Sequence, residues 1–293
     1  MEAALCINSW AAVSPPPEYT LEESLDYALA CEGSGVRERL TRELSRANGL
    51  LVVDASLLAD SVESFHCASL ILDDLPCMDD ATERRGRACL HLVAGEDQAM
   101  LAALALINRA YTGFWKVAAR YPQKSALAAK LVGRCMGESG ILYGQSRDLA
   151  FQAGLGEREV RTIAEHKTGM LLQLALMLPA LLGGADWRSL LRLARLAKGW
   201  GRLYQGIDDF SDMLMTGEST GKTPYRDLRQ ERPNLVVALG PERALAELRN
   251  LEVSSIRICR SFQGRGSAWR ILEDFHARLG DKVARIQGAL EAA

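Results

Sequence analysis

The sequence predicts an all-α protein, and two observations carry this prediction. Apolar residues recur three and four positions apart along nearly the whole chain, the spacing of one face of a helix, while strand-like alternation between turn residues is missing. Several helical segments are long and apolar on more than one side, as in KTGMLLQLALMLPALLGG. Such helices pack against others on several faces, so we expect a large helical bundle.

Length and composition limit the kind of protein. The chain has 293 residues and a formal net charge of −2, so it offers no general footprint for nucleic acid. No apolar run approaches the roughly 18 residues that cross a bilayer, and the N-terminus lacks the basic region of a signal peptide. The seven cysteines form no CxxC pair, which argues against a zinc site or a disulfide framework and favours a cytoplasmic location.

The first 20 residues are expected to form an extended arm, because they end in SPPPEYT, which contains three consecutive prolines. Thr20 and Glu23 have the spacing of a capping box, so the first helix should begin there, and a single domain should occupy 21–293. Glycine and proline residues then divide the chain, and the polar segment 216–227 is expected to be a loop. Helices are predicted at about 21–32, 36–48, 53–75, 93–119, 125–151, 157–182, 187–215, 240–262 and 267–290.

The first chemical signal is the segment SLILDDLPCMDDATERRGR at 69–87. Four carboxylates follow an apolar helical run, at Asp73, Asp74, Asp79 and Asp80. The six-residue step from Asp73 to Asp79 does not return to the same face of a straight helix. Because Pro76 can end or kink the helix between them, we expect Asp79 to swing back toward Asp73.

A second block, YQGIDDFSD, lies at 204–212. Asp208 and Asp212 are four apart, so on a helix they project from one face, at the edge of an apolar environment. Carboxylates placed there repel each other and lose solvation, so they need cations. Mg²⁺ suits them, since it accepts one or two carboxylates and completes its octahedron with water and phosphate oxygens. Either block alone could be a solvated acidic turn. Two blocks, each between an apolar run and basic residues, favour a shared diphosphate site.

Basic residues suited to a diphosphate accompany the two blocks. They are Arg84 and Arg85 in TERRGR, Lys167 in EHKTG, Lys222 in TGKTP and Arg232 in QERPN. Arginine makes bidentate contacts with phosphate, while lysine acts as a point charge. Each would be an ordinary surface cation if it stood alone, but together they complement the metal side of the site.

These motifs together resemble the trans-isoprenyl diphosphate synthases of the polyprenyl synthetase family. DDLPCMDD with RRG is similar to the first aspartate-rich motif of that family and YQGIDDFSD to its second, while GQSRDL, HKTG and GKTPYRD follow its order and spacing. The resemblance spans roughly 25–240 and implies the isoprenoid synthase fold, a bundle around a deep central cavity, usually a homodimer. It also implies a Mg²⁺-dependent prenyltransferase that condenses an allylic diphosphate with isopentenyl diphosphate, with a product of geranylgeranyl length as the best expectation.

The resemblance also implies roles for individual residues. Asp73, Asp79 and Asp208 would bind Mg²⁺, with Asp74, Asp209 and Asp212 beside them. Arg84, Lys167 and Lys222 would contact the allylic diphosphate, and Arg232 keeps the charge of a family lysine. Thr168 and Gln205 would line the reacting centre, and Arg39, His66 and Arg85 would hold isopentenyl diphosphate. The small residues Ala68 and Ser69 would leave the cavity floor open, which favours a product longer than farnesyl.

Departures from the family pattern fall mainly on the isopentenyl diphosphate half of the site. Val36 stands where the family signature GGKRxRP has lysine, and Leu72 stands where a histidine usually precedes the first motif. Three alternatives therefore stay open: a synthase with altered kinetics, a cyclase-like enzyme that ionises one diphosphate, and a modified subunit that needs an active partner.

A hypothesis from another class rests on two ExxH pairs. Glu63 with His66 and Glu273 with His276 could contribute to a di-iron carboxylate centre in a helical bundle. That centre needs further glutamates from two other helices and leaves both aspartate blocks unexplained. A noncatalytic partner protein is a further alternative, but it has no need for so much clustered negative charge.

Overall fold

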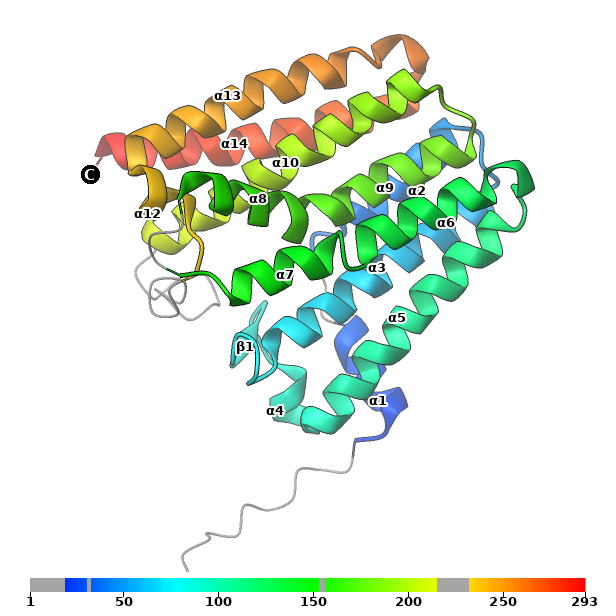
Figure 1. Ribbon diagram of the computed structural model, residues 1–293, viewed down its shortest axis with the longest axis horizontal. Helices are drawn as coiled ribbons and strands as arrows, with labels where there is room; N and C mark the ends of the chain where they lie inside the picture. The colour runs from blue at the N-terminus through cyan, green and yellow to red at the C-terminus, as the bar shows by residue number, and fades with distance from the viewer. Residues whose placement is uncertain (1–18, 31–32, 153–155, 215–231, 293) are drawn as a thin grey trace, which may run out of the picture.

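The computed structural model describes residues 19–30, 33–152, 156–214 and 232–292, and nearly all of this is helical (Figure 1). The prediction of an all-α bundle is confirmed. Among the described helices, none combines the length and apolar character that crossing a bilayer requires. Lys222, the segment 216–227 and nearly all of the proposed N-terminal arm lie outside the described residues. The α-helices are α1 (Leu21–Leu29), α2 (Val36–Ala47), α3 (Val52–Asp74), α4 (Leu90–Ala94), α5 (Glu96–Ala118), α6 (Pro122–Met136), α7 (Ile141–Leu149), α8 (Glu157–Lys167), α9 (Gly169–Leu182), α10 (Trp187–Leu214), α12 (Leu235–Leu239), α13 (Pro241–Arg260) and α14 (Ile271–Ala292).

The start of the first helix follows the prediction from its capping box. The Thr20 hydroxyl accepts from the backbone N–H of Glu23, and the Glu23 carboxylate accepts from the backbone N–H of Thr20. The bounds of α3 and α10 also agree with the prediction to within one residue. These two helices carry the two aspartate blocks at their C-terminal ends, so the same end of the bundle receives both (Figure 1).

Three predicted helices are wrong in one respect, because each is divided. The segment 93–119 is divided at Gly95, between the end of α4 and the start of α5. The segment 125–151 is divided into α6 and α7, and 157–182 into α8 and α9. A close contact between helices lies directly after the last break, at Gly169. A Cβ atom on Gly201 of α10 would lie 2.5 Å from the Gly169 Cα atom, so the two helices approach as closely as two glycines permit. Thr168, the residue between α8 and α9, directly precedes this contact.

A two-stranded hairpin, which the sequence did not predict, follows the first aspartate block. Strands β1 (Glu83–Arg84) and β2 (Arg87–Ala88) pair antiparallel, with Arg84 opposite Arg87. The two turn residues both have positive φ, 56° at Arg85 and 78° at Gly86, which is the requirement of a tight hairpin turn. This region is unfavourable for an arginine, so the paired strands hold the backbone of Arg85 in a conformation that it rarely adopts.

Candidate functional site

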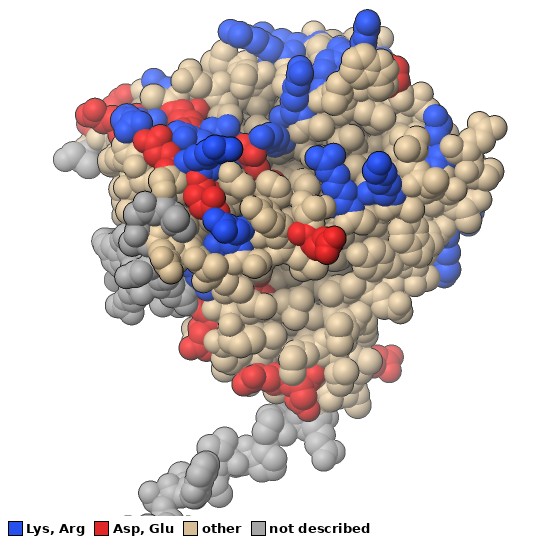
Figure 2. All heavy atoms as spheres, viewed as in Figure 1, with Lys and Arg blue, Asp and Glu red and all other residues tan. Residues whose placement is uncertain are grey.

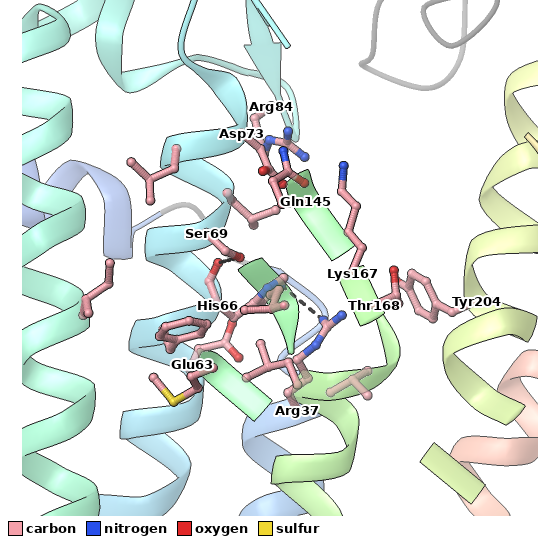
Figure 3. Close-up of a pocket in the computed structure, with 18 of the residues that line it drawn as sticks. Arg37, Glu63, His66, Ser69, Asp73, Arg84, Gln145, Lys167, Thr168 and Tyr204 are labelled. Atoms are coloured by element: carbon pink, nitrogen blue, oxygen red, sulfur yellow. Dashed lines mark hydrogen bonds between the residues drawn. The ribbon is translucent and has the colours of Figure 1, made fainter. Parts of the chain in front are cut away.

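A cavity of about 470 Å³ lies in the bundle and is lined by residues of both aspartate blocks. Asp73 of α3 and Asp208 of α10 both face it, together with Arg84, Arg85 and Lys167. Figure 3 shows Asp73, Arg84 and Lys167 gathered in one part of this cavity, with Thr168 nearby. The remaining wall is largely apolar and includes Phe65, Leu70, Ile107, Tyr111, Met136, Ile141 and Leu171. The cavity therefore joins a charged region to a hydrocarbon-like chamber.

The first aspartate block turns back on itself, as predicted from Pro76. Helix α3 ends at Asp74, and the backbone N–H of Asp79 donates to the carbonyl of Asp73 over 3.0 Å. Burial raises the pKa of the Asp73 carboxyl above its usual range, although Lys167 and Arg84 act in the opposite direction. A carboxylate held in such a place is stabilised by any further cation that enters.

Asp74 lies beside Asp73 in sequence but makes a different contact. Its buried carboxylate accepts from Nε of Arg84 over 2.9 Å and from Nη2 over 2.5 Å. This bidentate pair is the dominant favourable interaction that raises the pKa of Arg84 against its burial. Asp74 thus orients Arg84 at the cavity wall.

The third carboxylate of this region, Asp79, lies against Arg232. Nη2 of Arg232 is 3.2 Å from Oδ1 of Asp79 and donates to the carbonyl of Met78, while Nη1 donates to the carbonyl of Asp148 over 3.1 Å. The buried carboxylate of Asp148 in turn accepts from Nζ of Lys167 over 2.7 Å. One residue of the described chain, Arg232, therefore ties the first aspartate block to α7.

The second block splits between two faces of α10. Asp208 lines the cavity, whereas Asp209 is completely buried and does not belong to the cavity wall. The Asp209 carboxylate accepts from the backbone N–H of Leu235 over 2.7 Å and from Nε2 of Gln205 over 3.0 Å. Asp212 is half-buried and is not among the cavity-lining residues that the described chain supplies. The structure thus places Asp209 where it holds α12 against α10.

Thr168 and Gln205, both expected at the reacting centre, are in contact. The Thr168 hydroxyl donates to Oε1 of Gln205 over 3.2 Å. Thr168 lines the cavity, while Gln205 lies behind it and donates a hydrogen bond from its amide N–H to the Asp209 carboxylate. A chain of three hydrogen bonds thus runs from the cavity wall through α10 to the start of α12.

The half expected to hold isopentenyl diphosphate contains His66, Arg85 and a residue that was not selected from the sequence. Arg37 lines the cavity with its Nη1 3.2 Å from Nε2 of His66, whereas Arg39 is exposed and absent from the cavity wall of the described chain (Figure 3). The two arginines are two positions apart on α2, so they face different directions. The structure therefore places Arg37, and not Arg39, beside His66 on the cavity wall.

Burial and neighbouring charges define this half of the cavity electrostatically. Burial, followed by the charges of Arg37 and Arg85, holds the pKa of His66 well below its usual range, so its ring is neutral at pH 7. Burial also raises the pKa of Glu63, which shares this wall. Val36, the residue in place of the family lysine, lies on the cavity wall next to Arg37.

Polar atoms on the wall point to a ligand that supplies acceptors. Nε of Arg37 and Nε2 of Gln145 are buried and find no hydrogen-bond partner within the described ranges, and both residues line the cavity. A buried donor without an acceptor destabilises the fold unless a ligand or a water molecule accepts its hydrogen bond. The oxygens of a diphosphate would do so.

The sequence missed Arg37, Glu63, Gln145 and Asp148 as contributors to the site. A signal existed for Gln145 and Asp148, because both belong to GQSRDL, a motif that was recognised without a role for either. Glu63 lies one helical turn before His66 and was considered only as part of an ExxH pair. Of the two small residues expected at the cavity floor, only Ser69 lines the cavity. Ala68 is buried in the core beside it.

The acidic residues fit Mg²⁺ better than a metal that needs many protein ligands. Within the described ranges no three His, Cys, Asp or Glu side chains gather into one cluster able to hold a metal. Asp73 and Asp208 instead face a shared cavity with room for water and phosphate oxygens, the remaining ligands that Mg²⁺ prefers.

The di-iron hypothesis finds no support in the placement of the ExxH pairs. His66 contacts Arg37 at the cavity, whereas Nδ1 of His276 accepts from Nε1 of Trp200 in the core between α10 and α14. The two pairs thus lie on different helices in unrelated surroundings, each histidine with its own partner.

The chain is similar in sequence to known proteins. The sequence model of the family described as polyprenyl synthetase matches residues 18–257 of the chain. Geranylgeranyl pyrophosphate synthase 9, chloroplastic, of Arabidopsis thaliana is 33% identical over 254 residues, which cover 83% of this chain and 71% of the relative. Geranylgeranyl pyrophosphate synthase 10, mitochondrial, of the same plant is 33% identical over 245 residues, which cover 80% of this chain and 71% of the relative.

Solved structures share the fold. A geranyltransferase from Helicobacter pylori, complexed with magnesium and isoprenyl diphosphate, superposes with a TM-score of 0.74 at 23% identity, covering 99% of this chain and 91% of its own. A geranyltransferase from Legionella pneumophila gives a TM-score of 0.77 at 21% identity, covering 91% and 88%. These similarities confirm the predicted architecture of a helical bundle around a central cavity.

Proposed function

The chain belongs to the polyprenyl synthetase family, and we propose that it is a prenyltransferase that condenses an allylic diphosphate with isopentenyl diphosphate. The observation that carries this proposal is the cavity in which Asp73 and Asp208, from helices far apart in sequence, face Arg84 and Lys167 beside an apolar chamber. Charge at one end suits a diphosphate, and the apolar wall suits a prenyl chain.

The allylic diphosphate would lie with its anionic group among Asp73, Asp208, Arg84 and Lys167. Asp73 and Asp208 on the cavity wall would hold Mg²⁺, which would neutralise charge on the departing diphosphate. Asp79, which lies against Arg232, and Asp212, which lies off the wall of the described chain, are the further ligands that the family resemblance implies. Arg84, fixed by Asp74, and Lys167, fixed by Asp148, are in place before the carbon–oxygen bond breaks, so their reorganisation adds little to the barrier. We assign Asp209 a positioning role through α12, in place of the direct metal contact expected from the sequence.

Isopentenyl diphosphate would bind between Arg37, His66 and Arg85, with its double bond directed toward the allylic carbon. The new carbon–carbon bond forms as that carbon loses its diphosphate, and a proton then passes from the isopentenyl unit to an oxygen of the departed diphosphate. The apolar wall excludes water from the cationic carbon during this step. Thr168 offers its hydroxyl oxygen to that centre while its hydrogen is held by Gln205.

Product length, subunit number and location belong to the same proposal. The relatives' names support a geranylgeranyl-length product. We propose a homodimer that buries an apolar stripe on α5, where the exposed fractions are 46% for Met100, 49% for Leu101, 61% for Leu104 and 42% for Trp115. The proposed location is the cytoplasm, although the relatives named above are chloroplastic and mitochondrial.

One experiment tests the proposed reaction against its alternatives. Purified protein with Mg²⁺ is incubated with labelled isopentenyl diphosphate and each allylic primer in turn, and the products are sized. Incorporation of label into a longer prenyl diphosphate is expected. Consumption of the allylic diphosphate without incorporation would replace the proposal by the cyclase alternative, and activity that requires a second protein would replace it by the modified subunit.

A further inference from the structure

Four connections between helices meet at the end of the bundle that lies opposite the aspartate blocks. They join α2 to α3, α5 to α6, α9 to α10 and α13 to α14 (Figure 1). Helix α3 has 23 residues, so its first residue lies about 33 Å from the aspartates at its other end. We call this region, made of residues 43–54, 119–124, 183–192 and 262–270, the distal end.

The segments of the distal end are in contact with one another. Asn48, Gly183, Asp186 and Arg265 line one shallow surface depression. A Cβ atom added to Gly183 would lie 2.4 Å from the Asn48 carbonyl oxygen, so the ends of α2 and α9 touch. From this junction the chain runs on into the first residues of α3 after α2, and into the first residues of α10 after α9.

Both of these helix starts expose large apolar side chains. Leu51, Val52 and Val53 are 62%, 67% and 56% exposed, and Trp187 is 65% exposed with Leu191 at 46%. A single exposed apolar residue is normal on a protein surface. Five such residues on two helix starts at the same end of the bundle form a surface of the kind that marks an interaction site.

The charges around this patch are predominantly positive. The distal end contains seven basic and three acidic residues, which leaves an excess of four positive charges. Each acidic residue is paired with an arginine of the same region: Glu43 with Arg46, Asp54 with Arg120, and Asp186 with Arg265. Figure 2 shows blue side chains among tan atoms along the right-hand edge of the molecule, where this end lies.

We propose that this distal patch, Leu51–Val53 with Trp187 and Leu191, docks on the surface of an anionic lipid bilayer. Tryptophan prefers the boundary between headgroups and acyl chains, and the Arg188 guanidinium lies 5.8 Å from the Trp187 ring centroid, where it can reach headgroup phosphates. Apolar tips surrounded by arginine and lysine have the composition of peripheral membrane anchors. The docked end would hold the aspartate end of the bundle in the water phase.

A second copy of this chain is a poorer occupant of the same surface. A two-fold contact places each patch against itself, so the excess positive charges of two distal ends would be brought together and would repel. The bilayer proposal does not depend on the proposed reaction, since it concerns a surface that shares no residue with the cavity.

Vesicle sedimentation with the full chain tests the proposal. Binding is expected to vesicles of phosphatidylcholine mixed with phosphatidylglycerol, to be much weaker for phosphatidylcholine alone, and to fall as salt is added. A cation near an anionic surface strengthens partitioning about fivefold, so Arg188→Glu, a change of two charges, should weaken it about thirtyfold. The control is Arg249→Glu, at an exposed residue of α13. It makes the same charge change away from the patch and should alter vesicle binding little.

An apolar pair of variants separates docking from simple attraction of charges. Val52→Asp should abolish sedimentation with the mixed vesicles, whereas Val253→Asp, at an exposed valine of α13, should not. All four variants lie on the surface, and thermal unfolding of each checks that the fold is retained. Equal losses in a patch variant and its control would overturn the proposal, as would absent vesicle binding. A halved molecular mass in Val52→Asp alone would assign the patch to subunit contact, and stable capture of a soluble acidic protein in place of vesicles would assign it to that partner.

Discussion

Adjacent aspartates on α10 allow a sharp test of how the second block works. Asp209→Ala removes a buried acceptor from the backbone N–H of Leu235 and from Nε2 of Gln205. Hydrogen bonds to charged groups are worth roughly 1.5–3 kcal/mol each, so the loss of two should lower the free energy of unfolding by about 3–6 kcal/mol. For a chain of this size, that loss corresponds to a decrease of about 6–12 °C in the unfolding temperature.

The matched variant is Asp208→Ala, which truncates a side chain on the cavity wall. It should leave the unfolding temperature nearly unchanged and abolish turnover, because it removes a proposed metal contact and no core packing. Asp209→Asn keeps one acceptor oxygen and should lose about half as much stability as Asp209→Ala. Calorimetry and a prenyl transfer assay on the three proteins decide the matter. An Asp209→Ala protein as stable as the wild type but inactive would refute the positioning role and restore Asp209 as a metal ligand.

Four further predictions concern the cavity. Asp73→Ala should abolish turnover while calorimetry finds the fold retained, and near-normal activity would contradict its role at the metal. Val36→Lys should lower the KM for isopentenyl diphosphate, since it returns a cation to that wall; an unchanged KM would place Val36 outside the binding site. Asp148→Asn should raise the KM for the allylic diphosphate, because Lys167 loses the carboxylate that holds it, and equal effects on both substrates would count against this explanation. The pKa of His66 is lowered in the fold, so the unfolded chain binds more protons and stability should decline as pH falls below about 6.5; urea unfolding should show a shallower decline in His66→Gln, and an identical slope would contradict the neutral buried ring.

Local chemistry explains why much of the site was predictable. The turn of the first aspartate block follows from Pro76, since a proline directly after α3 prevents its continuation and the chain returns to Asp73. The pairing of the two blocks across one cavity followed from their shared composition and neighbouring cations. Helical periodicity predicted α3 and α10 well, because both are long and strongly apolar on their buried faces.

The sequence predictions failed where contacts between distant segments determine the structure. Arg37 and Arg39 are equally plausible as sequence, and only the packing of α2 beside α3 turns Arg37 toward His66. The hairpin at Arg85 was invisible because its strands have two residues each, too short for any periodicity.

The sequence by itself determined the fold class, the two aspartate blocks and the cations that accompany them, since these depend on residue type and short-range spacing. The tertiary structure alone decided which carboxylate of each pair faces the cavity: Asp74 turns to Arg84 and Asp209 to Leu235, leaving Asp73 and Asp208 on the wall. Neighbouring residues of a helix differ in direction by about 100°, and the buried donors that select between them come from parts of the chain that meet only on folding.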